Sequence, residues 1–281
     1  MDQRCMVMLI NGNLFPGLRP RFFCYVKEVY QFAVKRGIVT KDLTTIVIKP
    51  KTPEKRKDDE LLYWDKDQIN KFFGCIDKTK TRELEKYIAF KFLFLGGLRR
   101  GECFALNWSD LKIIGKDRVN VNVNKTLVLG GVNPPKTQAG YRVVPIIDKE
   151  LVDALADWRI KQKDWLNKLG QQVHDDNHQL VFESYKNTPH ERSILNKWMR
   201  DIIDKNGLSP KITVHKARHS FITNMLIAGV PPQTVQKLAG HSSPSITLAV
   251  YAHINDQGRV DAAQTLSNYM KSSGKDSEKD S

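Results

Sequence analysis

The feature that most constrains the fold is a mostly apolar run, Ile88 to Leu95. The pattern predicts a helix from about Glu83 to Leu95, with Gly96-Gly97 as its end. A helix that is apolar on most of its faces must be buried. Arg99 follows this helix and its turn directly. We therefore expect the charge of Arg99 to point into a protected cleft.

Helical patterns dominate the rest of the chain. Apolar residues recur at helical spacing from Arg21 to Arg36, and Asp65-x-x-Gln68 is typical of a capping box that opens a helix. Further helices are predicted over 100–106, 148–168, 190–205, 215–228, 232–239 and 244–252. The predicted fold class is mainly α with a small antiparallel β-sheet, an α+β arrangement.

Two stretches alternate apolar and polar residues as strands do. Val119, Val121 and Val123 form the first stretch. Tyr141 and Val143 belong to the second, with Pro145 expected at the strand's end. Together they predict a β-hairpin or small sheet over about 118–146, with Lys136 near its tip.

Composition divides the chain into four parts: a partial helical region over 1–48, a linker over 49–60, a large domain over 61–271 and a disordered tail over 272–281. The linker contains Pro and carries many charges. Its cations could track a phosphate backbone, and the alternative is a solvated linker that touches nothing. These cations are Lys49, Lys51, Lys55, Arg56 and Lys57.

The charge balance favours a polyanionic partner. Lys plus Arg number 45 against 31 Asp plus Glu, a formal net charge of +14. Nucleic acid is the first candidate and an anionic membrane face the second. Because no segment approaches the ~20 apolar residues of a membrane helix and no signal peptide is recognisable, we expect a cytoplasmic protein. The four cysteines lack Cys-x-x-Cys spacing, which favours reduced thiols over a disulfide frame or zinc site.

Six polar side chains occur in contexts that an ordinary core does not explain. His215 and Arg218 are three residues apart, which places both on one face of a helix. Tyr251 follows the Gly-His pair of His241 by ten residues. The six are Arg99, Lys136, His215, Arg218, His241 and Tyr251.

Such residues supply what a metal-free attack on a phosphodiester needs. The planar fork of arginine, here Arg99 and Arg218, can hold two phosphate oxygens and keeps its charge. A phenol, here Tyr251, can attack phosphorus and store the bond energy in a phosphotyrosine ester. The alternatives for these residues are a surface arginine, a helix-face salt bridge and a half-buried tyrosine.

The remaining candidates would move protons or donate hydrogen bonds. His215 could accept the phenolic proton, and His241 could donate a hydrogen bond to the phosphate or the leaving group. Lys136 could protonate the departing 5′ oxygen. The alternatives are hydrogen-bonded core histidines and a solvated lysine. Glu102 is expected to hold the helix after Arg99 and not to take part in catalysis.

The order Leu-Arg-x-Gly-Glu, His-x-x-Arg, Gly-His and Tyr resembles the tyrosine recombinases, the phage-integrase family, over about residues 60–255. The resemblance implies a catalytic integrase domain over 61–271, preceded by part of a core-binding domain. It implies that the six residues form the active site and that Tyr251 forms a covalent 3′-phosphotyrosyl link. No metal or cofactor is implied.

The resemblance also implies a biological role. Such a recombinase integrates or excises a phage or mobile element in a bacterium, at the nucleoid. It acts as a homo-tetramer on double-stranded DNA with attachment-site-like repeats. An accessory DNA-bending or directionality protein is a possible further partner.

Two other interpretations stay open. The region before the linker matches only the last part of a core-binding domain, which suggests a truncated and catalytically impaired integrase. Residues 227–240 resemble a helix-turn-helix, which suggests a regulator that binds DNA without cutting it. Tyr251 discriminates, because a regulator has no use for that tyrosine. The cluster from His174 to His178 looks like a metal ligand set, although a solvated loop explains it better.

Overall fold

The computed structural model describes residues 19–46, 62–241 and Val250, in two compact units, 1–60 and 61–281. In the first unit, helix α2 (Arg19–Lys35) confirms the helix predicted from Arg21. A 3₁₀ turn, η1 (Leu43–Thr45), follows, and Asp42 caps it by accepting a hydrogen bond from the Thr44 amide at 2.9 Å.

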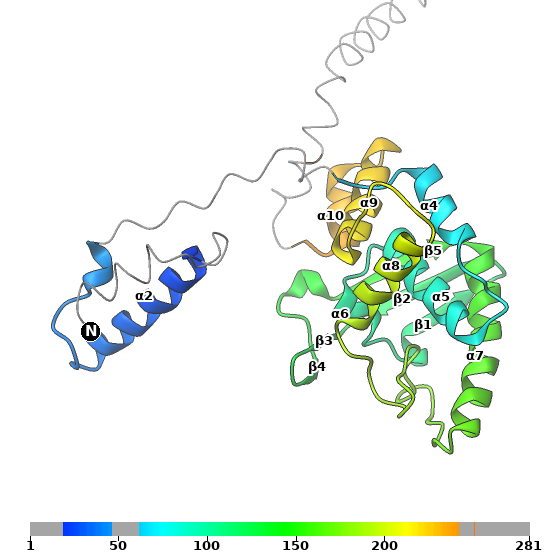
Figure 1. Ribbon diagram of the computed structural model, residues 1–281, viewed down its shortest axis with the longest axis horizontal. Coiled ribbons are helices and arrows are strands. Elements are labelled where there is room, and N and C mark those ends of the chain that lie inside the picture. The colour runs from blue at the N-terminus through cyan, green and yellow to red at the C-terminus, as the bar shows by residue number, and fades with distance from the viewer. Residues whose placement is uncertain (1–18, 47–61, 242–249, 251–281) are drawn as a thin grey trace, which may run out of the picture. The chain divides into compact units, whose positions relative to one another are not determined.

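Seven helices described in the second unit make it mainly α (Figure 1). The predicted capping box is confirmed, because Asp65 accepts from the Gln68 amide at 2.9 Å and Gln68 accepts from the Asp65 amide at 3.0 Å. The helices are α4 (Lys66–Gly74), α5 (Thr81–Gly96), α6 (Arg100–Cys103), α7 (Lys149–Lys168), α8 (Ile194–Lys205), α9 (Val214–Ile227) and α10 (Pro232–Ala239).

The strands form two small antiparallel sheets, so the predicted fold class is confirmed. Strands β1 (Leu111–Ile114), β2 (Arg118–Val123) and β5 (Arg142–Ile147) pair in the order β1-β2-β5. A separate hairpin, β3 (Thr126–Val128) and β4 (Gly131–Asn133), stands between β2 and β5 in the sequence. Two short 3₁₀ turns complete this region, η2 (Trp108–Asp110) before β1 and η3 (Gln138–Gly140) before β5.

The prediction for β5 was partly wrong. Its buried residues are Val144 and Ile146, whereas Tyr141 and Val143 are exposed, and the strand continues past Pro145. The pairing with β2 explains the facing, because Val144 and Ile146 oppose buried valines of that strand. Pro145 is tolerated because β5 is an edge strand of the sheet.

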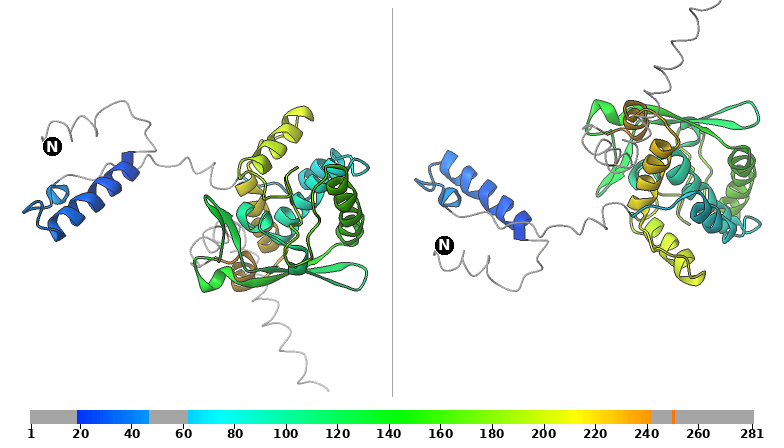
Figure 2. Two further views of the ribbon diagram at one scale, coloured as in Figure 1. Left: turned by 90° about the horizontal axis from the view of Figure 1, so that it is seen from below. Right: turned by 90° about the horizontal axis from the view of Figure 1, so that it is seen from above.

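The apolar helix α5 lies at the centre of the core, as predicted. Ile88, Phe92 and Leu93 are fully buried, and α5 packs against α7, α9 and β5. The sheet lies along one side of the unit with the helices on the other (Figure 2). Within residues 19–46 and 62–241, no helix combines the length and the apolar character that a bilayer crossing requires.

Candidate active site

A tight turn after α5 places Arg99. Gly97 ends the helix with a left-handed φ of +60°, and a Cβ there would lie 2.3 Å from the ring of Phe221. Leu98 is fully buried, and Arg99 then caps α6 from an extended backbone conformation. The turn therefore requires glycine. It brings the Arg99 side chain out of the core, where 42% of it is exposed.

The buried carboxylate of Glu102 holds this arginine. It accepts hydrogen bonds from the backbone amide and Nη1 of Arg99, each at 2.7 Å. The prediction that Glu102 anchors the helix after Arg99 is therefore confirmed. Arg142 on β5 adds two more bonds to Glu102, from Nη2 at 2.8 Å and Nη1 at 3.1 Å. Burial raises the pKa of Glu102, but the bonds and charge of Arg142, with Arg99, outweigh burial and lower it to about 2.

Arg218 lines the same pocket as Arg99, with only 3% of its side chain exposed. Its Nη1 donates to the Gly97 carbonyl at 2.6 Å, and its Nη2 donates to the Ala239 carbonyl. Burial first, and then the charges of Arg99 and Arg142, lower the pKa of Arg218 to about 9, so it remains a cation at neutral pH. The guanidinium groups of Arg99, Arg142 and Arg218 surround the single carboxylate of Glu102. The cluster therefore has a net positive charge, which favours binding of an anion.

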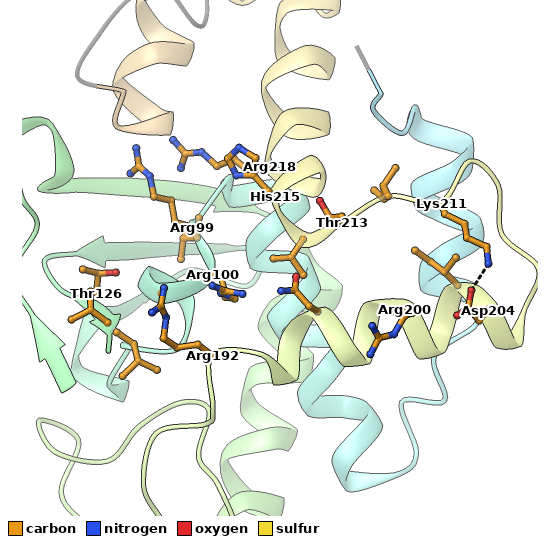
Figure 3. A pocket seen from close by; sticks show the side chains of 18 residues that line it. Arg99, Arg100, Thr126, Arg192, Arg200, Asp204, Lys211, Thr213, His215 and Arg218 are labelled. Atoms are coloured by element: carbon orange, nitrogen blue, oxygen red, sulfur yellow. Dashed lines mark hydrogen bonds and ion pairs between the residues drawn. The ribbon is translucent and has the colours of Figure 1, made fainter. Parts of the chain in front are cut away.

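His215 stands about one turn before Arg218 on α9. Both residues line one pocket together with Arg99 (Figure 3), so the prediction that they share a helix face is confirmed. The Nε2 atoms of His215 and His219 are 3.2 Å apart. One of these atoms donates and the other accepts, so His219 can set which nitrogen of His215 carries a proton.

His241 follows α10, and arginines hold the residues just before it. Gly240 has a left-handed φ of +64°, and its carbonyl accepts from Arg99 Nη2 at 2.7 Å. Arg142 Nε donates to the Leu238 carbonyl at 2.7 Å. Burial and the charges of Arg218 and Arg99 lower the pKa of His241 to about 4. The imidazole is therefore neutral at pH 7 and can both donate and accept.

The pocket has a volume of about 720 Å³ and lies among α6, β3, α8 and α9. Its lining is strongly basic, and Asp204, its acidic member, is bonded to Lys211 at 2.6 Å. The basic and histidine side chains of the lining are Arg99, Arg100, Arg192, Arg200, Lys211, His215 and Arg218. Such a concave cationic surface suits a polyanion and disfavours a neutral ligand.

Lys136 is not at the position that the sequence predicted. It is exposed in the connection from β4 to η3, whereas the β3–β4 hairpin turns at Gly130. The β-hairpin or small sheet expected over about 118–146 is present as the antiparallel pair of β2 and β5. The β3–β4 hairpin lies between these strands in the sequence, so Lys136 is in a loop after β4 and not at a hairpin tip. It is not among the residues that line the pocket.

The remaining predicted residues lie outside the part of the chain that the structure describes. These are the nucleophile candidate Tyr251 and the linker cations Lys49, Lys51, Lys55, Arg56 and Lys57. The structure therefore brings together Arg99, His215 and Arg218, with His241 held beside them through Gly240. The roles of all six residues stay predictions.

Arg142 was missed from the sequence, although it contacts Glu102 and the segment before His241. Only 6% of its side chain is exposed. The one signal was an arginine at the start of the apolar alternation of β5, where a buried charge needs a partner. That partner, Glu102, lies far away in the sequence, so no local pattern could identify it.

The side chains of the described His174–His178 loop are not arranged as a metal-binding site. Within residues 19–46 and 62–241, no group of three His, Cys, Asp or Glu side chains could hold a metal ion. His178 Nδ1 lies 2.8 Å from Asp175, and Asp176 pairs with Arg159 at 2.5 Å. These polar groups contact protein partners.

Comparison with known proteins gives concordant matches. The model of the phage integrase family matches residues 63–258. A XerC-like tyrosine recombinase of Caldanaerobacter subterraneus is 28% identical over 86% of this chain and 63% of its own length. The ICEBs1 integrase of Bacillus subtilis is 28% identical over 87% of this chain and 64% of its own length. This chain thus spans somewhat less than two thirds of these curated relatives.

A solved structure shows the same fold. The XerH site-specific recombinase, bound to a palindromic difH substrate in a post-cleavage complex, superposes with a TM-score of 0.69 at 18% sequence identity. The match covers 94% of this chain and 72% of XerH.

Proposed function

Because the chain belongs to the phage integrase family, we propose that it is a site-specific DNA recombinase that cuts and rejoins DNA through a 3′-phosphotyrosine. The observation that carries the proposal is the paired placement of Arg99 and Arg218 in one basic pocket with His215. Three guanidinium groups around one carboxylate form a preorganised cationic site. Such a site stabilises the charge that develops on a phosphate under attack.

In the proposed reaction, the Tyr251 oxygen attacks phosphorus. A new P–O bond to the phenol forms, the bond from phosphorus to the 5′ oxygen breaks, and the 5′ strand leaves as a hydroxyl. His215 accepts the phenolic proton, and Lys136 delivers a proton to the leaving oxygen. Arg99 and Arg218 hold the non-bridging oxygens throughout. Rejoining is the reverse reaction with another 5′ hydroxyl and needs no further energy source.

The low pKa of His241 supports its role as a hydrogen-bond donor in this scheme. Because the pKa of His241 is about 4, its imidazole is neutral under physiological conditions. A neutral ring can donate a hydrogen bond to a phosphate oxygen without adding a further buried cation next to Arg218. His241 is therefore a hydrogen-bond donor in the proposed site and not an acid.

The partners follow from the same proposal. The relatives are named as recombinases or integrases, and XerH was solved on DNA. We place double-stranded DNA with attachment-site-like repeats in the pocket. A homo-tetramer acting at the bacterial nucleoid, with an accessory bending or directionality protein, belongs to this proposal. Integration or excision of a mobile element would be the outcome.

A covalent-adduct assay tests the proposal. The full chain is incubated in EDTA with nicked suicide duplexes built from the DNA that flanks its own gene. We expect a protein–DNA adduct on a denaturing gel that Tyr251→Phe abolishes. Tyr185→Phe, at a tyrosine that is 62% exposed outside the pocket, is the matched control and should form the adduct. DNA binding without any adduct would instead support a regulator or an impaired integrase.

A further inference from the structure

A pair of arginines next to the catalytic residues has no role in the proposed reaction. Arg100 follows Arg99 on α6, and Arg192 precedes α8. Both line the same pocket as Arg99 and His215 (Figure 3). They lie close enough that the charge of Arg192 helps, after burial, to lower the pKa of Arg100.

Among the described residues, no acidic side chain neutralises either arginine. In the described part of the chain, no hydrogen bond or ion pair joins the Arg100 or Arg192 side chain to an acidic residue, whereas Lys211 in the same pocket is paired with Asp204. Two like charges held together without an acid raise the energy of the empty pocket. An anion between them would remove this repulsion.

The backbone segments that carry Arg100 and Arg192 are both held by packing or hydrogen bonds, so the two arginines have fixed positions in the pocket. A Cβ at Gly101 would lie 2.6 Å from the Leu127 carbonyl and from Thr126 Oγ1, so α6 packs directly on β3. On the other side, His190 Nε2 lies 2.7 Å from the buried carboxylate of Glu85. That contact anchors the segment that carries Arg192 two residues later.

We infer that Arg100 and Arg192 form a second phosphate subsite, which binds a phosphate of the same DNA molecule beside the scissile one. The inference rests on the proposed function, because continuity with Arg99 and His215 in one pocket identifies the occupant as DNA. The Thr126 hydroxyl also lines this part of the pocket and can donate to a phosphate oxygen. The subsite positions the strand and takes no part in bond breaking.

The test compares two double variants of the full chain with equal loss of charge. Arg100→Gln/Arg192→Gln removes the subsite. Lys116→Gln/Arg118→Gln removes two exposed cations around the β1–β2 turn that do not line the pocket. For each protein, the equilibrium constant for binding a short mixed-sequence duplex is measured against salt concentration in EDTA.

We expect the subsite variant to reduce the magnitude of the negative slope of log K against log salt by about 1, the value for one lost phosphate contact. The control variant should change the slope by much less. In the adduct assay, the subsite variant should need about tenfold more DNA for half-maximal adduct. The substitutions should raise this half-saturating DNA concentration more than they lower the rate of adduct formation at saturating DNA.

Equal slopes in the two variants, with adduct still formed by the parent, would overturn the subsite and leave the proposed function intact. No adduct from the parent would overturn the proposed function. In that case a slope difference between the variants would still establish a DNA phosphate contact at the pair. A melting temperature of the subsite variant equal to or above that of the parent would exclude misfolding as the cause.

Discussion

At the scale of single residues, Arg142 links the segments that carry the candidate catalytic groups. It bonds Glu102, which holds Arg99, and also the carbonyls of Gly140 and Leu238, at 3.2 and 2.7 Å. The first carbonyl belongs to η3, which follows the connection that carries Lys136, and the second precedes His241. Arg142 is therefore a positioning residue that acts through its neighbours.

Arg142→Gln should impair the chemistry through displaced neighbours. Breaking a buried ion pair costs about 3–5 kcal/mol of stability, and misplacing a catalytic group by ~1 Å costs about 100-fold in rate. We expect both losses, measured by urea unfolding and by the rate of adduct formation at saturating DNA. Arg142→Lys should restore part of the rate because it keeps the charge. Arg118→Gln, on the exposed part of β2, is the control, and an equal rate in both Gln variants would contradict the positioning role.

The pKa of His241 makes a prediction about pH. The folded value of about 4 lies below the ordinary value of 6.5, with burial as the main cause. Neutral His241 therefore contributes stability that is fully present above pH 6.5 and is lost as pH falls through 4. We expect its ring signals in NMR spectra to stay constant between pH 8 and about pH 5.5, with assignment by His241→Asn. A midpoint near 6.5 would show that neither burial nor the charges of Arg218 and Arg99 lower the pKa of His241.

The candidate residues divide according to how local their evidence is. Arg99, His215 and Arg218 could be predicted because each stands in a short motif, and the structure brings them into one pocket. Arg142 and Arg192 could not be predicted, because the side chains that they contact or adjoin come from distant segments of the chain. A buried arginine is recognisable only once its carboxylate is in place.

At the scale of elements, the turn between α5 and α6 controls the site. Gly97→Ala would place a Cβ against the Phe221 ring at a left-handed φ. We expect a loss of more than ~1 kcal/mol in the free energy of unfolding, because Phe221 or the turn must move. The adduct rate should fall as well, since the Gly97 carbonyl accepts from Arg218.

Gly74→Ala is the matched control for this turn. Gly74 is the last residue of α4, and a Cβ there would meet nothing within 4 Å. The substitution should raise stability by roughly 0.4–1 kcal/mol by restricting the unfolded chain. Equal effects of the two substitutions in urea unfolding would show that the α5–α6 turn tolerates a side chain.

Two buried carboxylates, Glu85 of α5 and Glu183 of the segment after α7, share Arg82 as an ion-pair partner. Glu183 is fully buried, and burial first, and then the charge of Glu85, raise its pKa from the ordinary 4.5 to about 8. Protonated Glu183 therefore contributes stability that is fully present below pH 4.5 and is lost as pH rises through 8. Gln162 and Arg82 face it and limit the shift, and His190 faces Glu85.

Glu183→Gln should remove this pH dependence. We expect the free energy of unfolding of the variant to fall less than that of the parent between pH 5 and pH 9, measured by urea titration at each pH. Asp153→Asn, at an exposed carboxylate paired with Lys149 on α7, is the control and should follow the parent curve. Parallel curves for the parent and Glu183→Gln would show that Glu183 is ionised in the folded protein.

Helices could be predicted from the sequence more reliably than strand facing. The periodicity of α5 and the capping box of α4 are local signals, and both are confirmed. The facing of β5 depends on pairing with β2, and the β3–β4 hairpin depends on packing against α6. Both are interactions between distant segments, so alternation alone could not give the facing of β5 and placed Lys136 near a hairpin tip.

At the scale of the whole molecule, the net charge of +14 is spread between the pocket and the rest of the chain. The linker cations Lys49, Lys51, Lys55, Arg56 and Lys57 lie outside the described residues, and their contact with DNA stays a prediction. The salt dependence of DNA binding distinguishes direct phosphate contacts from a general effect of net charge, because each contact releases counterions. Each phosphate that a cation neutralises contributes about 0.9 to the salt slope.

Changing all five linker cations to Gln should therefore reduce the magnitude of the negative salt slope by up to about 4.5 if every one contacts DNA. The matched control changes four lysines and one arginine of the second unit that are exposed and lie outside the pocket lining: Lys66, Lys112, Lys116, Arg118 and Lys168. Both proteins lose the same net charge. A larger reduction in the magnitude of the salt slope for the linker variant would therefore assign phosphate contacts to the linker. Matching slopes would mean that the linker cations contribute no more to DNA binding than exposed cations elsewhere, as in a solvated linker. The same pair of proteins would then show adduct formation at the same DNA concentration.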